Sequence, residues 1–409
     1  MTKNDDKRIP ALRFKGFNDD WAQRKLGDYI TVNKIKNKEN NHFIPYSISN
    51  KWGFIPQEKQ FGEGNTYSKT NKATNYIVEP NTFAYNPARI NVGSIAYQNN
   101  QFPVIVSSLY EIFKAKKNLN DEFLMNWFKT EKFTRQIQKL QEGGVRQYFF
   151  IDKMQESRIT IPFISEQEEI SKTLNQISNL IKLQQRKMEQ LKLLKKAMLQ
   201  KGFTNKSAPT LRFKGFSKAW TEYPLGNLGK ACSGYGFPNS EQGGNKGIPF
   251  YKVSDMNLAG NEDEMIYANN YVTDAQIDRN NWKPIVDVPA IFFAKVGAAV
   301  LLNRKRLCKR PFLLDNNTMA YSLNKNILST QFTKSLFETI NLPSLIQVGA
   351  LPSYNTNDIE SIKVKIPKID EQEKIGILLK KIERLITRQQ SKIKRLQSTK
   401  QFLLQNMFI

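Results

Sequence analysis

Few residues in this sequence are suited to catalysis. His42 is the only histidine, which excludes a two-histidine metal site and leaves one candidate base for a Ser-His-Asp triad. A lone histidine is more commonly an ordinary loop residue. A magnesium-dependent nuclease of the common type needs a carboxylate followed by Asp/Glu-x-Lys, and the only such triplet is Asp5-Asp6-Lys7. We therefore expect neither a hydrolytic nor a nuclease centre.

The motifs of a self-contained base methyltransferase are also missing. Such an enzyme needs a Gly-rich loop for adenosylmethionine and an Asn/Asp-Pro-Pro-aromatic box that holds a flipped base. Residues 86–89, Asn-Pro-Ala-Arg, match only the start of that box and are better explained as a turn. Cys232 and Cys308 lie far apart without a metal-ligand spacing. We predict no catalytic residues, no metal site and no cofactor in this chain.

The charge of the chain indicates a polyanionic partner. There are 62 Lys and Arg residues against 37 Asp and Glu, a net charge of +25, and 40% of the residues are hydrophobic. That hydrophobic share is too high for a disordered basic tail, so the chain should fold, and nucleic acid is the first candidate ligand. A generally basic protein is the alternative. No apolar run approaches the roughly 18 residues of a membrane span, and we expect a cytoplasmic protein.

Polar, basic and aromatic residues alternate in several loops, in a pattern suited to reading DNA. Arg, Asn, Gln and Ser can pair with base edges in the major groove, whereas Lys and Tyr serve phosphates. For any single residue, a solvated loop is the alternative interpretation. The candidate DNA-binding residues are Tyr46, Ser47, Asn50, Lys51, Arg89, Asn91, Arg146, Gln147, Tyr148, Ser233, Tyr235, Lys252, Ser254, Asp255, Arg304, Lys305, Ser353, Tyr354 and Asn355.

These loops belong to a chain that is internally duplicated. The Leu-Arg-Phe-Lys-Gly-Phe motif at residues 12–17 recurs at residues 211–216, and each copy is followed by a tryptophan and a Leu-Gly pair. A second block, Ile-Pro followed by Glu-Gln-Glu, begins at Ile161 and again at Ile366. Two repeated blocks around dissimilar middles indicate a duplication whose centres diverged.

The second block of each half should begin a long helix. Ser165 and Asp370 are N-cap residue types, and glutamates that suit the helix dipole follow them. At about 1.5 Å per residue, each helix would be roughly 50 Å long. Apolar residues recur at spacings of three and four, which favours an antiparallel helix pair whose register is set by Gln184 and Gln389; ordinary packing against a domain is the alternative. The predicted seam consists of Ile170, Leu174, Ile177, Ile181, Gln184, Met188, Leu191, Ile375, Leu379, Ile382, Ile386, Gln389, Ile393 and Leu396.

The two middles are predicted to be α+β modules. In the first, strands are expected at residues 42–49, 82–86, 94–98 and 103–115, with a helix at 121–141. In the second, strands are expected at 248–253, 290–294, 298–303 and 319–323, with a helix near 329–341. Residues 92–96 and 296–300 are alike and each follows an aromatic strand. The two middles should therefore share a fold.

Four segments together carry a family resemblance over the whole chain. They are residues 12–17 with Trp21, residues 85–94, residues 233–238 (Ser-Gly-Tyr-Gly-Phe-Pro) and residues 366–373 (Ile-Pro-Lys-Ile-Asp-Glu-Gln-Glu). The sequence resembles the specificity subunit of type I restriction-modification systems. The paired entry to a long helix is the most specific element of the likeness.

The resemblance implies an α+β architecture with a pseudo-two-fold repeat. Two α/β target-recognition domains, residues 1–164 and 204–366, would be separated by two conserved spacer helices, residues 165–203 and 367–409, packed as an antiparallel coiled coil.

The same resemblance implies a non-catalytic subunit that binds double-stranded DNA, each half reading one part of a bipartite site. It would direct adenine methylation and DNA restriction by its partners, two modification subunits and the restriction subunits. Adenosylmethionine, ATP and Mg would be cofactors of those partners. The alternatives are a stand-alone sequence-specific DNA-binding regulator and a self-contained enzyme.

Overall fold

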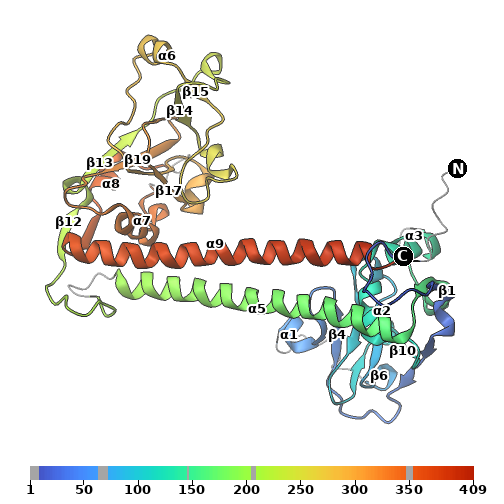
Figure 1. Cartoon of the computed structure of the whole chain (residues 1–409). Helices are drawn as coiled ribbons and strands as arrows, with labels where there is room; N and C mark the ends of the chain where they lie inside the picture. Colours follow the sequence, from blue (N-terminus) through green and yellow to red (C-terminus); the bar gives the residue numbers. More distant parts are fainter. Residues whose placement is uncertain (1–8, 63–71, 145–146, 204–208, 347–352) are drawn as a thin grey trace. The chain divides into compact units, whose positions relative to one another are not determined.

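The computed structural model describes residues 9–62, 72–144, 147–203, 209–346 and 353–409 (Figure 1). The chain forms two compact units, one made of residues up to 185 together with 391–409, the other of residues 186–390. Both units take part of each long helix, α5 (Ile164–Gly202) and α9 (Ile369–Asn406). In the described part of the chain, no helix is long and apolar enough to cross a membrane. The Asp5-Asp6-Lys7 triplet lies outside the described residues.

The first unit contains a four-stranded antiparallel sheet in the order β2-β10-β7-β8, a three-stranded sheet β3-β6-β9 and the pairs β4-β5 and β1-β11. Its strands are β1 Ala22–Lys25, β2 Ile30–Val32, β3 Ile35–Lys36, β4 Tyr46–Ser49, β5 Gly53–Pro56, β6 Tyr76–Val78, β7 Thr82–Tyr85, β8 Ile95–Gln98, β9 Val104–Val106, β10 Glu111–Ala115 and β11 Arg158–Ile161. Its helices are η1 Leu26–Asp28, α1 Gln57–Phe61, η2 Lys72–Thr74, η3 Ile90–Val92, α2 Asp121–Trp127, α3 Glu131–Leu140 and α4 Ile151–Glu156, where η denotes a 3-10 helix.

The core of the first unit is aromatic. Phe83 and Phe113 stack on the sheet with ring centroids 5.1 Å apart, and Phe128 at the end of α2 packs edge-on to both. The core also takes Leu174 from the start of α5 and Phe408 from beyond the end of α9. Residues from both ends of the chain thus complete one hydrophobic core.

The second unit repeats this plan with a four-stranded antiparallel sheet β13-β19-β16-β17, a three-stranded sheet β15-β14-β18 and the pair β12-β20. Its strands are β12 Thr221–Pro224, β13 Gly229–Ser233, β14 Ile248–Tyr251, β15 Tyr271–Val272, β16 Ala290–Ala294, β17 Lys305–Cys308, β18 Leu313–Leu314, β19 Thr318–Leu323 and β20 Lys363–Ile366. Its helices are η4 Leu225–Asn227, η5 Asn239–Glu241, η6 Val253–Asn257, α6 Asp274–Arg279, η7 Ala298–Leu302, α7 Thr330–Thr339, η8 Leu342–Leu345 and α8 Thr356–Glu360.

The two four-stranded sheets have the same strand order and the same antiparallel pairings, so the two middles share a fold as predicted. The register of the sequence likeness, however, was wrong. Gly93 follows the 3-10 helix η3 in the left-handed conformation, and Asn303, with φ 49°, follows η7 in the same conformation. Gly297 instead precedes η7.

Several predicted elements need correction. The predicted strand at residues 298–303 is instead the 3-10 helix η7 (Ala298–Leu302) with Asn303 as its C-cap, and the neighbouring strand β17 begins at Lys305. The segment 103–115 is divided into β9 and β10, and the predicted helix at 121–141 into α2 and α3, because Asn120 and Thr130 each cap a new helix by accepting a backbone N–H. The long helices begin at Ile164 and Ile369, so Ser165 and Asp370 lie in the first turn rather than at the N-cap.

Along both long helices, every residue of the predicted seam is buried or half-buried, including Gln184 and Gln389 at 8% exposure. Within the second unit, an ion pair between Lys195 and Glu383 connects α5 with α9. Within the first unit, Ile170 and Leu404 bring the start of α5 and the end of α9 into one core. Coiled-coil packing along the whole length of the helices stays a prediction.

Candidate nucleic-acid interface

In the first unit, a short connection between β7 and β8 carries two candidate residues out of the sheet. Asn86 begins it as a turn, since its side-chain oxygen accepts the N–H of Ala88 at 3.0 Å. The chain then forms η3 and returns through Gly93, whose positive φ of 85° suits glycine. As a result, Arg89 and Asn91 are exposed at the edge of the sheet.

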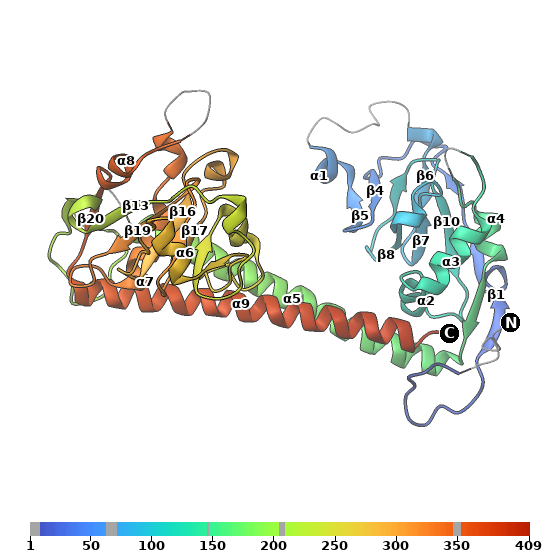
Figure 2. The same ribbon diagram turned by 90° about the horizontal axis from the view of Figure 1, so that it is seen from above.

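The β4–β5 hairpin packs beside this connection, and Figure 2 shows β5 next to β8. The hydroxyl of Ser94 donates to the carbonyl of Ile48 at 3.0 Å. At its tip the hairpin exposes the predicted residues Asn50 and Lys51, and also Trp52, which sequence reasoning missed. Trp52 is 66% exposed, and the Lys51 ammonium lies 4.8 Å from its ring centroid. A cation beside an exposed aromatic ring suits a base or sugar as well as a phosphate.

A third segment joins the same edge. The backbone N–H of Phe149 donates to the carbonyl of Pro87 at 3.0 Å, so residues 147–150 lie against the β7–β8 connection. Gln147 is exposed, and the ring of Tyr148 stacks on Phe150 with centroids 5.4 Å apart. Arg146 lies outside the described residues. The structure thus gathers three separate sequence segments at one edge of the first unit.

The second unit presents the corresponding edge of its sheet. Strand register places Ser233 opposite Met319 and Phe293 opposite Lys305, so β13 and β16 end here, where β17 begins. Lys295, directly after β16, donates its ammonium to the Ser233 hydroxyl at 2.7 Å. Sequence reasoning missed Lys295, although its position after a buried aromatic strand is a signal comparable to that of Arg89.

Two further candidates complete this edge. Ser353 lies opposite Val296 in a β-bridge, which brings residues 353–355 to the end of β16. Arg304, just before β17, donates to the side chain of Asn257 at 2.8 Å. The second edge therefore carries Ser233, Lys295, Arg304 and Ser353, a set of side chains that differs from that of the first unit.

Other predicted residues are buried and have structural roles. Tyr46 and Ser47 are 7% exposed beneath the hairpin, and Tyr354 is 3% exposed with its hydroxyl donating to the carbonyl of Ala294. Asp255 is fully buried and accepts two N–H groups of Asn269. Burial lowers the pKa of Lys305 to about 8, and its ammonium donates to Asn303 and to the carbonyl of Ile340. These five residues support the edges rather than lie on them.

The remaining candidates lie on loops of the second unit. Lys252 donates to Gln242 at 3.2 Å, and the hydroxyl of Tyr235 accepts the backbone N–H of Lys283. Ser254 is exposed. Asn355 is exposed too, but its side chain caps α8.

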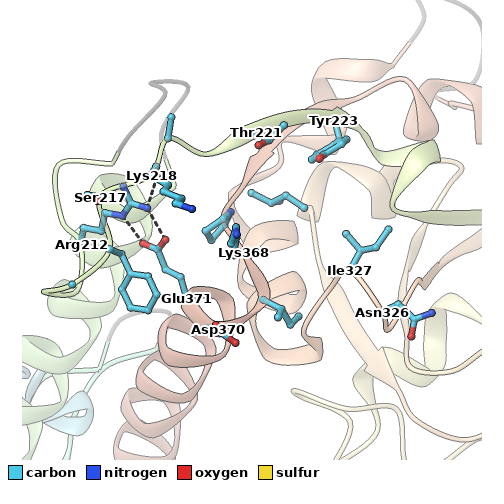
Figure 3. A pocket seen from close by; sticks show the side chains of 16 residues that line it. Arg212, Ser217, Lys218, Thr221, Tyr223, Asn326, Ile327, Lys368, Asp370 and Glu371 are labelled. Carbon is cyan, nitrogen blue, oxygen red and sulfur yellow. Dashed lines mark hydrogen bonds and ion pairs between the residues drawn. The ribbon is translucent and has the colours of Figure 1, made fainter.

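A cavity of about 690 Å³ lies where the two repeated blocks of the second unit meet (Figure 3). Arg212 donates through Nε and Nη2 to the carboxylate of Glu371, both at 2.7 Å, and through Nη2 to the carbonyl of Lys218. Hydrogen bonding to Glu371 raises the pKa of Arg212. Within the described residues, no group of three His, Cys, Asp or Glu side chains is arranged to hold a metal ion. The chemistry of this cavity is that of a structural ion pair.

The family model described as type I restriction modification DNA specificity domain matches residues 18–193 and 217–397. The chain belongs to this family. The two matched stretches correspond to the two copies of the duplication, each running from a recognition-type α+β module into a long helix. As a member, the chain is a DNA sequence-specificity subunit of the type I restriction-modification class, which is generally non-catalytic.

Two curated relatives come from Methanocaldococcus jannaschii. The type I restriction enzyme MjaVIII specificity subunit is 23% identical, covering 90% of this chain and 87% of the relative. The putative type I restriction enzyme MjaX specificity subunit is 24% identical, covering 90% of this chain and 88% of the relative. Both matches extend over both repeats.

Solved structures share the fold. The type I restriction-modification S subunit from M. genitalium superimposes with a TM-score of 0.62 at 15% identity, covering 98% of this chain and 99% of that one. A chain from a study of complex assembly and conformational transition of a type I system superimposes with a TM-score of 0.54 at 13% identity, covering 94% of this chain and 96% of that one.

Proposed function

We propose that each unit reads one part of a bipartite double-stranded DNA site through its sheet edge. The observation that carries this proposal is that the same edge of the same four-stranded sheet bears exposed or half-exposed polar and basic groups in both units, but different ones. Asn50, Arg89 and Asn91 occupy the first edge, whereas Ser233 and Lys295 occupy the second. Different donors and acceptors at equivalent positions would recognise different bases.

The proposal extends to the complex in which the chain acts. Two modification subunits would bind adenosylmethionine and methylate adenine, and restriction subunits would use ATP and Mg, all in the cytoplasm. This chain would supply no catalytic residue. The support lies in the sequence, which has one histidine, neither methyltransferase box, and its only nuclease-type triplet at residues 5–7.

Exchanging residues 28–145 for the segment of another family member should change one half of the methylated motif and leave the other half unchanged. The exchange replaces the β4–β5 hairpin and the β7–β8 connection of the first sheet edge, but retains residues 147–150, the repeated blocks and the long helices. Sequencing the methylated adenines in cells that express the chimera with its partner subunits would measure this. The matched control exchanges residues 227–350, which should change only the other half. A change in both halves from either exchange would contradict the proposal.

Replacing Arg89 by alanine should weaken binding of the cognate duplex by about 1–3 kcal/mol, the range for an arginine that reads a base edge. Arg89 is exposed at the turn after β7, so its removal leaves the core intact. Arg135 on α3, whose side chain is 70% exposed, provides the matched control. Titration of labelled duplexes by fluorescence anisotropy would show the difference, and equal affinity losses for the two variants would count against the assigned edge.

A further inference from the structure

The two units can be compared position by position where α2 and α7 pack on the long helices. Gln167 accepts the N–H of Asn120 at the start of α2, and Gln372 accepts the N–H of Ser329 at the start of α7. One turn further on, the ring of Phe123 packs at a tilt against Phe408 with centroids 5.0 Å apart, and the ring of Phe332 packs in the same way against Phe203 with centroids 5.2 Å apart.

These contacts fix the correspondence between the units. Counting along the helices from these anchors, Lys129 occupies the position of Glu338, and Lys400 that of Lys195. In the same way, Ser178 occupies the position of Glu383.

In the second unit, these positions form a neutralised ion-pair cluster. Lys195 lies 2.6 Å from Glu338 and 2.6 Å from Glu383, and Lys334 lies 2.8 Å from Glu383. The carboxylates raise the pKa of Lys195 against the opposing effect of burial. In this unit, carboxylates of the same chain form ion pairs with Lys195 and Lys334.

In the first unit, both acids are missing. Lys129, Lys182 and Lys400 are close enough to influence one another, and no carboxylate in the described part of the chain forms an ion pair with any of them. Burial, together with the charges of Lys400 and Lys182, lowers the pKa of Lys129 to about 8. Burial and then Lys182 lower the pKa of Lys400. These three lysines therefore lie in one neighbourhood of the first unit, and none of them has an acidic ion-pair partner among the described residues.

This lysine cluster, Lys129, Lys182 and Lys400, adjoins the elements that support the first sheet edge. Thr130, directly after Lys129, caps α3, and Phe133 of α3 packs against Phe149 at 6.0 Å. Phe149 is the residue whose N–H donates to Pro87 in the β7–β8 connection. Lys129 is thus linked to that edge through α3 and Phe149.

We propose that Lys129, Lys182 and Lys400 form a phosphate-binding cluster that holds the DNA backbone beside the first sheet edge. The second unit has no equivalent cluster among its described residues. The inference rests on the proposed function, because it takes DNA as the ligand of that edge. Duplex DNA supplies closely spaced negative charges, and lysines that neutralise them release counterions. The cluster contributes affinity without sequence preference.

Substitution of Lys129 by glutamate tests the proposal with two readouts that should move in opposite directions. K129E recreates the carboxylate of Glu338 next to Lys400, so the melting temperature of the first unit should rise. Affinity for any duplex should fall by about tenfold at 0.1 M salt, because a phosphate contact is lost and a negative charge is added. Differential scanning calorimetry and anisotropy titration of the full chain would measure the two effects.

A second variant isolates the salt dependence. In K129Q/K182Q/K400Q, the slope of log K against log salt should fall by about 3, with the ratio of cognate to non-specific affinity unchanged. Lys172→Gln, on the same helix and paired with Glu169, is the control and should change little. If the salt slope of the triple variant were unchanged, the inference would be overturned. The same would follow if the triple variant kept its DNA affinity but lost binding of an acidic protein partner. Failure of the bipartite reading would appear separately, in the exchange of residues 28–145.

Discussion

Replacing Glu166 by alanine should lower the free energy of unfolding of the first unit by about 3–5 kcal/mol. Arg13 donates to both carboxylate oxygens of Glu166, at 2.7 and 2.8 Å, and the indole N–H of Trp21 donates at 3.2 Å. Glu166 is 1% exposed, so its removal leaves the indole N–H of Trp21 without a partner and the Arg13 guanidinium without its counter-charge, bonded only to the carbonyl of Asp19. Urea unfolding followed by hydrogen exchange of β10 amides would give the loss.

The duplication supplies a graded comparison. Glu371 in the second unit accepts from Arg212 in the same bidentate way, but Trp220 Nε1 has no hydrogen-bond partner in the described residues. Glu371→Ala should therefore cost less than Glu166→Ala, by about 1 kcal/mol for the missing bond. Glu168, exposed on the same turn as Glu166, is the control. A large loss for Glu168→Ala, or none for Glu166→Ala, would show that the buried carboxylate does not hold the block in place.

Replacing Phe408 by alanine should destabilise the first unit by about 3–5 kcal/mol. Phe408 is 4% exposed and packs on Phe123, although it lies far from Phe123 in the sequence. The cavity left behind would lie among side chains of α2, α5 and the end of α9, which can close over it only in part. Because the first sheet edge is supported by the same core, methylation of the DNA site should fall together with the stability of the first unit.

Phe402 provides the matched control for this prediction. It is an aromatic residue in the last turns of α9, a few residues before Phe408, but it is 55% exposed. Phe402→Ala should stay within about 0.5 kcal/mol of the parent chain. Chemical denaturation would measure the free energy of unfolding of both variants. Because both substitutions are Phe→Ala, the difference between them reports the effect of burial. Equal losses would indicate that the end of α9 acts through helix propensity rather than through the core of the first unit.

The packing of the helix ends explains why the two kinds of repeated block stayed similar. The N–H of Leu12 donates to the carbonyl of Asn406 at 2.9 Å, and the N–H of Leu211 donates to the carbonyl of Lys201 at 3.5 Å. Each Leu-Arg-Phe-Lys-Gly-Phe motif thus contacts the end of one long helix and, through its arginine, the start of the other. A substitution in one of these motifs must therefore remain compatible with its contacts to both long helices.

Much of this organisation could be predicted from sequence, since it depends on local patterns. The apolar spacing along residues 164–202 and 369–406 is a direct consequence of helical periodicity, and each predicted seam residue is buried or half-buried. Strands such as β7 and β16 were recognised by their aromatic and β-branched residues. Residues 298–303 misled the same reasoning because β propensity depends on the surface on which a segment packs, and this segment forms the 3-10 connection between β16 and β17.

The sequence by itself determined the duplication, the two long helices, the basic character of the chain and its family. The tertiary structure decided which loop residues are available to DNA: it buried Tyr46, Asp255 and Tyr354, and it placed Trp52 and Lys295 at the edges. It also showed that Lys129 stands where the other half has Glu338. The two residues lie in the diverged middles, where sequence similarity does not align them. Their correspondence is seen only because α2 and α7 pack in the same way against the long helices.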